Sequence, residues 1–131
     1  MTPKLRVRHD DVTEPPPATW SNCLVVDDWI YTAGMTARDG TTILGQDEYG
    51  QARAIFGKLE KLLDAAGARM DDIVKLVVYV TDISRREEVW RARREFFAEP
   101  FPVSTLVEVS ALAAPALKVE IEAVARRGAG G

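Results

Sequence analysis

The chain has 131 residues, of which 47% are apolar and 28% are charged, so it is long enough for one compact domain and too short for two ordinary ones. A domain of this length buries roughly two thirds of its unfolded surface, and its core needs no disulfide or structural metal. Seventeen Lys and Arg against twenty Asp and Glu give a net charge of −3. That sign is opposite to the basic surface of a nucleic-acid binder and argues against such a partner.

Residues 1–131 are expected to form a single domain, because no repeat, low-complexity tract or interior linker interrupts them. Only the glycine-rich tail, about residues 127–131, is expected to fray. No apolar run approaches the roughly 18 residues of a membrane span, so we expect a cytoplasmic protein with no membrane partner.

Cysteine and histidine each occur once, as Cys23 and His9. This excludes an internal disulfide and a zinc finger, and leaves no well-placed imidazole for a Ser-His or Cys-His catalytic pair. Cys23 has no basic neighbour in the sequence and is expected to be a buried, inert thiol. His9 is expected in an exposed loop, so any chemistry must use other groups.

The first third of the chain predicts a β-hairpin. Residues 5–8 are compatible with a short strand, and the three prolines at 15–17 then force an extended loop because they lack N–H donors. Residues 23–26 and 29–33 are β-branched or aromatic runs, and the two aspartates between them fit a two-residue turn.

A long amphipathic helix follows a polar loop that begins at residues 38–40. Apolar residues from Tyr49 to Ala66 recur at steps of three and one, which places them in one stripe on a helix. Gly67 stands where a helix ends in a left-handed residue.

The second half predicts a central strand, a second helix and two further strands. Residues 73–81 are apolar on both alternating faces, as in a buried strand. A capping box at 84–87 opens the second helix, and the prolines at 100 and 102 stop it. Residues 105–111 and 117–124 are the last two strands, the latter with alternating apolar and polar positions.

This order predicts an α+β fold in which a mixed sheet of about six strands carries both helices on one face. Two helices cover only one side of a sheet. The other side carries every second residue of the central strand, either the set that includes Val77 and Tyr79 or the set that alternates with it. We therefore expect another copy of the chain to cover that face, which makes the protein a homo-oligomer.

Several segments in order resemble the Rid family of reactive intermediate deaminases, also called YjgF-like proteins and formerly L-PSP endoribonucleases. The resemblance runs almost from one end of the chain to the other. Each matching segment is a weak indication by itself, but their order and spacing together are specific to the family. The matching segments are 29–34 (WIYTAG), 51–52 (QA), 65–67 (AAG), 71–75 (DDIVK), 80–82 (VTD), 96–97 (FF), 101–102 (FP), 107–109 (VEV) and 119–125 (VEIEAVA).

The resemblance implies a chorismate-mutase-like fold and a homotrimer whose three sheets form a central barrel with clefts between subunits. In such proteins the intersubunit cleft hydrolyses 2-imino or enamino acids to 2-keto acids and ammonia, without a metal or an organic cofactor. The small-molecule substrate of this chain is expected to be an imine, an enamine or a related unsaturated metabolite. An aminomuconate-like dienamine is one conceivable substrate, and only the analogy with the family suggests it.

This chain departs from the deaminating members at the positions that line the cleft. Those members carry a Pro-Ala-Arg-Ser segment whose arginine binds the substrate carboxylate, and Ser104 stands at the arginine position here. Trp20 replaces a tyrosine, Ala33 a serine and Trp90 an asparagine. A serine hydroxyl cannot make the bidentate, charge-assisted pair of a guanidinium, so the substrate is expected to differ.

Glu120 matches the family carboxylate that positions the attacking water, and an ionised glutamate in a cleft suits that work. A solvated or ion-paired carboxylate on a strand face is the structural alternative. Glu122, on the same face of the strand, is expected to be structural.

The other candidates concern substrate binding, and each has a structural alternative. Ser104 and Thr105 offer hydroxyls to a ligand, or else satisfy the backbone at a strand start. Arg93 lies one helical turn from Trp90. Its guanidinium would replace the missing cation if it enters the cleft; otherwise Arg93 belongs to a solvated helix face. Trp20 and Trp90 would wall a flat, apolar pocket, although Trp90 also fits core packing.

Two further functions remain open at this point. One is a non-catalytic binding or regulatory trimer that keeps the cleft and lacks the chemistry. The other is the ribonuclease of the older family name, for which the sequence offers neither a basic groove nor a pair of histidines.

Overall fold

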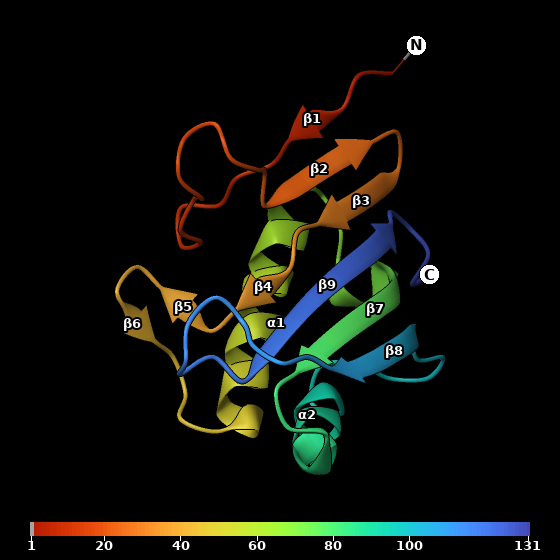
Figure 1. Cartoon of the computed structure of the whole chain (residues 1–131). Helices are drawn as coiled ribbons and strands as arrows, with labels where there is room; N and C mark the ends of the chain where they lie inside the picture. Colours follow the sequence, from red (N-terminus) through yellow and green to blue (C-terminus); the bar gives the residue numbers. More distant parts are fainter. Residues whose placement is uncertain (1) are drawn as a thin grey trace.

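The computed structural model describes residues 2–131, and its elements alternate much as the sequence predicts (Figure 1). The strands are β1 (Leu5–Arg6), β2 (Cys23–Val26), β3 (Trp29–Thr32), β4 (Met35–Thr36), β5 (Arg38–Asp39), β6 (Thr42–Ile43), β7 (Ile73–Val80), β8 (Val103–Glu108) and β9 (Val119–Arg126). The helices are α1 (Glu48–Ala65) and α2 (Arg86–Arg93), with single 3-10 turns at η1 (Met70–Asp72) and η2 (Ile83–Arg85).

The main sheet has seven strands in the order β1-β2-β3-β9-β7-β8, and the short β4 also pairs with β9. Only β7 and β8 are parallel, so the sheet is mixed. In Figure 1, α1 lies behind the sheet and α2 lies at its lower end. The α+β prediction is confirmed. The predicted hairpin is present, with Asp27 at a positive φ of 54° in its turn. The loop expected at 38–40 instead forms the small β5-β6 hairpin, which turns at Gly40 with a φ of 62°.

Helix α1 supplies most of the core on its side of the sheet. The Asp47 side chain caps it by accepting a hydrogen bond from the Gly50 N–H at 2.8 Å, and Gly67 follows its end with a φ of 77°. Its buried stripe matches the predicted one and consists of Ala52, Ile55, Phe56, Leu59, Leu62 and Leu63.

Helix α2 is shorter than predicted, and the capping box at 84–87 is absent. The carboxylate of Asp82 accepts from both the backbone N–H and the hydroxyl of Ser84, at 3.0 and 2.6 Å, so these residues form a 3-10 turn and the helix begins at Arg86. Phe96 and Phe97 follow the helix and pack against Phe56, with ring centroids 5.3 and 5.6 Å apart, the first pair tilted and the second edge-on. They therefore join α2 to α1 from outside the helix.

The open face of the sheet, opposite the helices, presents an apolar surface. Tyr31 is 47% exposed, Trp29 39%, Val103 66% and Val107 41%. Tyr79 also lies on this face, since it pairs with Val107 and Glu120. Large exposed apolar patches commonly mark contact surfaces.

The tail from residue 127 onward, expected to fray, is hydrogen-bonded to the body of the protein. Arg127 Nε donates to the carbonyl of Ala66 at 2.8 Å, and the Gly130 N–H donates to Asp72 Oδ1 at 2.9 Å. Arg69 donates to the carbonyl of Gly131 at 2.8 Å. No helix within residues 2–131 is long and apolar enough to cross a membrane.

Gln51 is a buried polar residue that joins α1 to the segment before β9. Its side chain donates to the carbonyl of Ala116 at 2.8 Å and accepts from the Lys118 N–H at 2.8 Å. Replacing Gln51 with alanine removes both hydrogen bonds from these part-buried backbone groups and should lower the free energy of unfolding by about 1 to 3 kcal/mol. Urea denaturation at fixed protein concentration tests this, with the exposed Glu60→Ala on the same helix as control; equal midpoints for both variants would contradict it.

Candidate active site

Glu120 lies near the start of β9, on the open face of the sheet. It pairs with Thr36 of β4 on one side and with Tyr79 of β7 on the other. The Tyr79 hydroxyl donates to Glu122 Oε1 at 2.6 Å, so the neighbouring carboxylate is already engaged. The half-buried Glu120 side chain makes no hydrogen bond to any group in residues 2–131. It is therefore available to a water molecule or a ligand.

The environment of Glu120 makes its carboxylate more basic than usual. Burial raises the pKa of Glu120, and the negative charge of Glu122 raises it further. A glutamate whose pKa moves toward neutrality is a better general base, because proton transfer to it is more favourable.

Gly34 provides the space in which the Glu120 carboxylate sits. A Cβ built at Gly34 would lie 2.8 Å from Glu120 Cδ and closer still to Oε2. Any side chain here would push the carboxylate aside. Gly34 was not among the candidate site residues, although it ends the WIYTAG segment, because nothing in a single sequence shows which side chain will approach a glycine.

A cavity of about 360 Å³ lies between the N-terminal loop and β4, and Gly34 is part of its lining. Trp20, which is 54% exposed, lines it together with Glu14 and Arg38. Lys58 lines it too and donates to the carbonyls of Thr36 and Arg38. Burial lowers the pKa of Lys58. We call Trp20, Gly34 and Glu120 the Glu120 half of the site.

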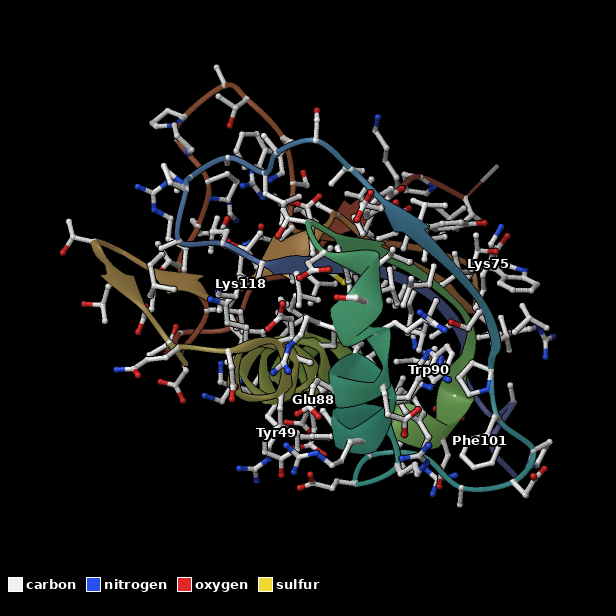
Figure 2. The ribbon with its side chains drawn as sticks, turned by 60° about the horizontal axis from the view of Figure 1, so that its bottom comes forward. Tyr49, Lys75, Glu88, Trp90, Phe101 and Lys118 are labelled. Atoms are coloured by element: carbon white, nitrogen blue, oxygen red, sulfur yellow. The ribbon has the colours of Figure 1, made fainter. Side chains whose placement is uncertain are left out.

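A second cavity, of about 280 Å³, lies between α2 and the segment that leads into β8. It is lined by Trp90, Arg93, Arg94 and Phe101, and Figure 2 shows Trp90 and Phe101 on the same side of α2. An Nη of Arg93 donates to Ser104 Oγ at 2.9 Å. We call Trp90, Arg93, Phe101 and Ser104 the Arg93 half of the site.

The two halves do not meet within one chain. Ser104 pairs with Leu76, which is buried beneath the helices, whereas Glu120 pairs with Tyr79 on the open face. Because side chains alternate along a strand, Ser104 and Glu120 point to opposite faces of the sheet. Trp20 lines a cavity that reaches Gly34, and Gly34 in turn lies against Glu120, whereas Trp90 and Arg93 lie with Ser104.

Two other predicted site residues stand apart from both halves. Ala33 packs against the hydrophobic core, and its N–H donates to the carbonyl of Asn22 at 2.8 Å. Thr105 is exposed on the open face, where it pairs with Val77. Within the described chain, these two residues line neither cavity, and neither side chain forms a hydrogen bond to Glu120 or to Arg93.

Of the two groups that were expected to be inert, Cys23 has the predicted surroundings and His9 does not. Cys23 is 1% exposed, and burial raises the pKa of its thiol to about 11. His9 is half-buried rather than exposed, and its Nδ1 accepts a hydrogen bond from the Asp11 N–H at 3.0 Å within the N-terminal loop. Nowhere in residues 2–131 do three His, Cys, Asp or Glu side chains gather as a metal site would require.

Comparison with known proteins places this geometry in a family. The family described as Endoribonuclease L-PSP matches residues 12–127. The chain belongs to this family. The resemblance to Rid and YjgF-like proteins is thereby confirmed, and a solved relative from Yersinia pestis is itself described as a member of the conserved Rid protein family.

Among sequence relatives, a 2-iminobutanoate/2-iminopropanoate deaminase from Dermatophagoides farinae is 30% identical and covers 95% of this chain and 97% of its own. The deaminase of that name from Salmonella typhimurium is 34% identical over 75% of this chain and 79% of its own. Among solved structures, a protein of unknown function from Pseudomonas aeruginosa is 42% identical with a TM-score of 0.89, covering 98% of this chain and 95% of its own.

Proposed function

We propose that this protein is a hydrolase that releases ammonia from a small imine, enamine or related unsaturated metabolite, at a site formed between two copies of the chain. The observation that carries the proposal is Glu120: a half-buried carboxylate with a raised pKa and no hydrogen-bond partner within residues 2–131, set against a glycine. The names of the deaminase relatives support the same reaction.

Hydrolysis of the C=N bond requires little from the protein except a base held close to the attacking water. A water molecule adds to the sp² carbon of the C=N bond while Glu120 accepts its proton. With the substrate nitrogen protonated as an iminium, this addition gives a neutral carbinolamine, and protonated Glu120 then returns its proton to the amino group. The C–N bond breaks with its electron pair on the departing ammonia, and Glu120 takes the hydroxyl proton as the oxygen becomes the carbonyl of the product. Ammonia accepts that proton and leaves as ammonium, which restores the carboxylate. The chain's own residues supply each proton transfer, so the proposal includes no metal or organic cofactor.

A second copy of the chain would complete the site. Ser104 and Glu120 point to opposite faces of one sheet, so the Arg93 half must come from a neighbouring subunit if both act on one molecule. The exposed apolar residues of the open face, Trp29, Tyr31, Val103 and Val107, fit burial against other copies. We propose a homotrimer whose sheets pack around a central barrel, as the family resemblance implies.

Ammonia release from freshly generated 2-iminobutanoate tests the proposal, with the spontaneous rate measured alongside. We expect the protein to accelerate release at least about tenfold, a modest factor because the imine also hydrolyses unaided. Light scattering should give the mass of three chains.

The alternatives predict different results in the same experiment. Binding without acceleration for every imine and enamine tried, detected as a rise in melting temperature, would favour a non-catalytic binding trimer. Cleavage of RNA without any effect on imines would favour the ribonuclease of the family name.

A further inference from the structure

Arg93 differs from the adjacent Arg91 and Arg94 because, within residues 2–131, its charge has no anionic partner. Arg91 pairs with Glu88 and Arg94 pairs with Glu87, both at 2.8 Å. Within residues 2–131, no carboxylate lies within ion-pair distance of Arg93, although its side chain is half-buried. A partly desolvated guanidinium without a counter-ion is energetically unfavourable, and an anion bound there would offset that cost.

Ser104 fixes the position of this guanidinium. One Nη of Arg93 donates to Ser104 Oγ at 2.9 Å, while the Nε and the other Nη have no hydrogen-bond partner in the described chain. A guanidinium carries five N–H donors, so those that remain still offer the paired donors that a carboxylate accepts. Serine is small enough to leave room for a long side chain from α2 to lie beside the strand.

The cavity beside Arg93 combines its guanidinium with flat apolar surface. Burial and, to a lesser extent, the charge of Arg94 lower the pKa of Arg93. Arg94 lines the same cavity but is paired with Glu87, so Arg93 supplies the unpaired positive charge there. Trp90 and Phe101 form the rest of the lining, and Phe101 is 46% exposed (Figure 2). A cation beside two aromatic rings favours an anion that carries an apolar tail.

We propose that Arg93, positioned by Ser104, binds the carboxylate of the substrate, and that Trp90 and Phe101 bind an aromatic or branched apolar side chain of the same molecule. The inference rests on the proposed function for the reaction and adds the class of substrate, a 2-imino or enamino acid with a bulky apolar tail. The cation comes from α2, and Arg93 is a binding and specificity residue, distinct from Glu120.

Binding of phenylpyruvate, an aromatic 2-keto acid that resembles the expected product, isolates this inference from catalysis. Isothermal titration should show that Arg93→Met weakens binding by about 30-fold or more, because truncating one partner of a charge pair has an effect of at least this size. Arg91→Met, the same change on the same helix outside the cavity, should alter the Kd by less than threefold. Phenylacetone, which lacks the carboxylate, should bind weakly to the wild type and equally to both variants.

A relocated charge gives a second measurement that a merely structural role would not reproduce. The double variant Arg93→Ser with Ser104→Arg moves the guanidinium from the helix to the strand and should recover phenylpyruvate binding to within about fivefold of the wild type. Should Arg93→Met fail to fold, as melting curves would reveal, Arg93→Lys replaces it, with an expected loss of about threefold to tenfold.

Two results would overturn the inference: unchanged phenylpyruvate affinity in a folded Arg93→Met variant, or equal wild-type affinity for phenylpyruvate and phenylacetone. Failure of the proposed function would look different. In that case phenylpyruvate binds through Arg93, and no imine is hydrolysed.

Discussion

Replacing Glu120 with glutamine should slow enzymatic imine hydrolysis by about 100-fold, the lower range for loss of a general base. Glutamine keeps the size and the hydrogen-bonding oxygen of the side chain but cannot accept a proton. The carboxylate has no hydrogen-bond partner within residues 2–131, so the substitution breaks no contact there and stability should stay close to that of the wild type. Ammonia release under kcat/KM conditions, together with melting curves, measures both quantities.

The pH dependence of kcat/KM adds a signature of the base itself. Protonated Glu120 cannot accept a proton, so activity should be low in acid and rise as pH passes through the pKa of Glu120. Burial and Glu122 raise that pKa, so the rising limb should lie above the ordinary glutamate value. Removing the like charge with Glu122→Gln should shift the limb to lower pH, and Glu120→Gln should abolish it.

Matched controls separate the base from general effects. Glu60→Gln changes an exposed carboxylate on α1 and should leave kcat/KM unchanged. Gly34→Ala keeps Glu120 but places a methyl group where its carboxylate lies, so it should lower activity as well. Full activity in Glu120→Gln would remove this residue from the mechanism.

The helices and strands are predicted well from the sequence because, in most of them, apolar residues recur at the spacing of a helix or a strand. The stripe from Tyr49 to Ala66 predicts α1 to within one residue at each end. The alternation of Val119, Ile121 and Ala123 with polar residues correctly gives the buried face of β9. The prediction of a capping box at 84–87 was wrong because the Asp82 carboxylate accepts the Ser84 N–H that the box would have used, and the chain forms a 3-10 turn there. Competition between neighbouring caps depends on local geometry that a pattern of residue types does not contain.

The site was less predictable than the fold, since it depends on which way side chains point. Glu120 was found from its resemblance to a family carboxylate, and the structure gives it a suitable environment. The division into two halves follows from the register of β8 and β7, which sends Ser104 toward the helices. A register is set by pairings between distant segments, so the sequence alone does not reveal it. The contact from Arg93 to Ser104 likewise joins a helix to a strand 11 residues later.

Mixing two inactive variants should restore activity if the site is shared between subunits. Glu120→Gln damages only the Glu120 half, and Arg93→Met damages only the Arg93 half. In mixed oligomers formed by joint refolding at equal amounts, a site needs an intact Glu120 from one subunit and an intact Arg93 from the next. Each condition holds with probability one half, so about a quarter of the sites should be intact. The specific activity on an imine of an aromatic 2-keto acid should then rise from a few per cent of the wild-type value to about a quarter of it.

The pairing of variants decides whether this recovery reflects shared sites. Mixing Glu120→Gln with Gly34→Val, which damages the same half, should restore nothing, because the intact Glu120 then lies only in subunits where valine displaces it. If instead both halves acted within one chain, the first mixture would also stay at the mean of its parents, since no subunit in it carries both intact residues. Recovery confined to the first mixture would therefore require a second copy of the chain at each site, as the opposite orientation of Ser104 and Glu120 predicts.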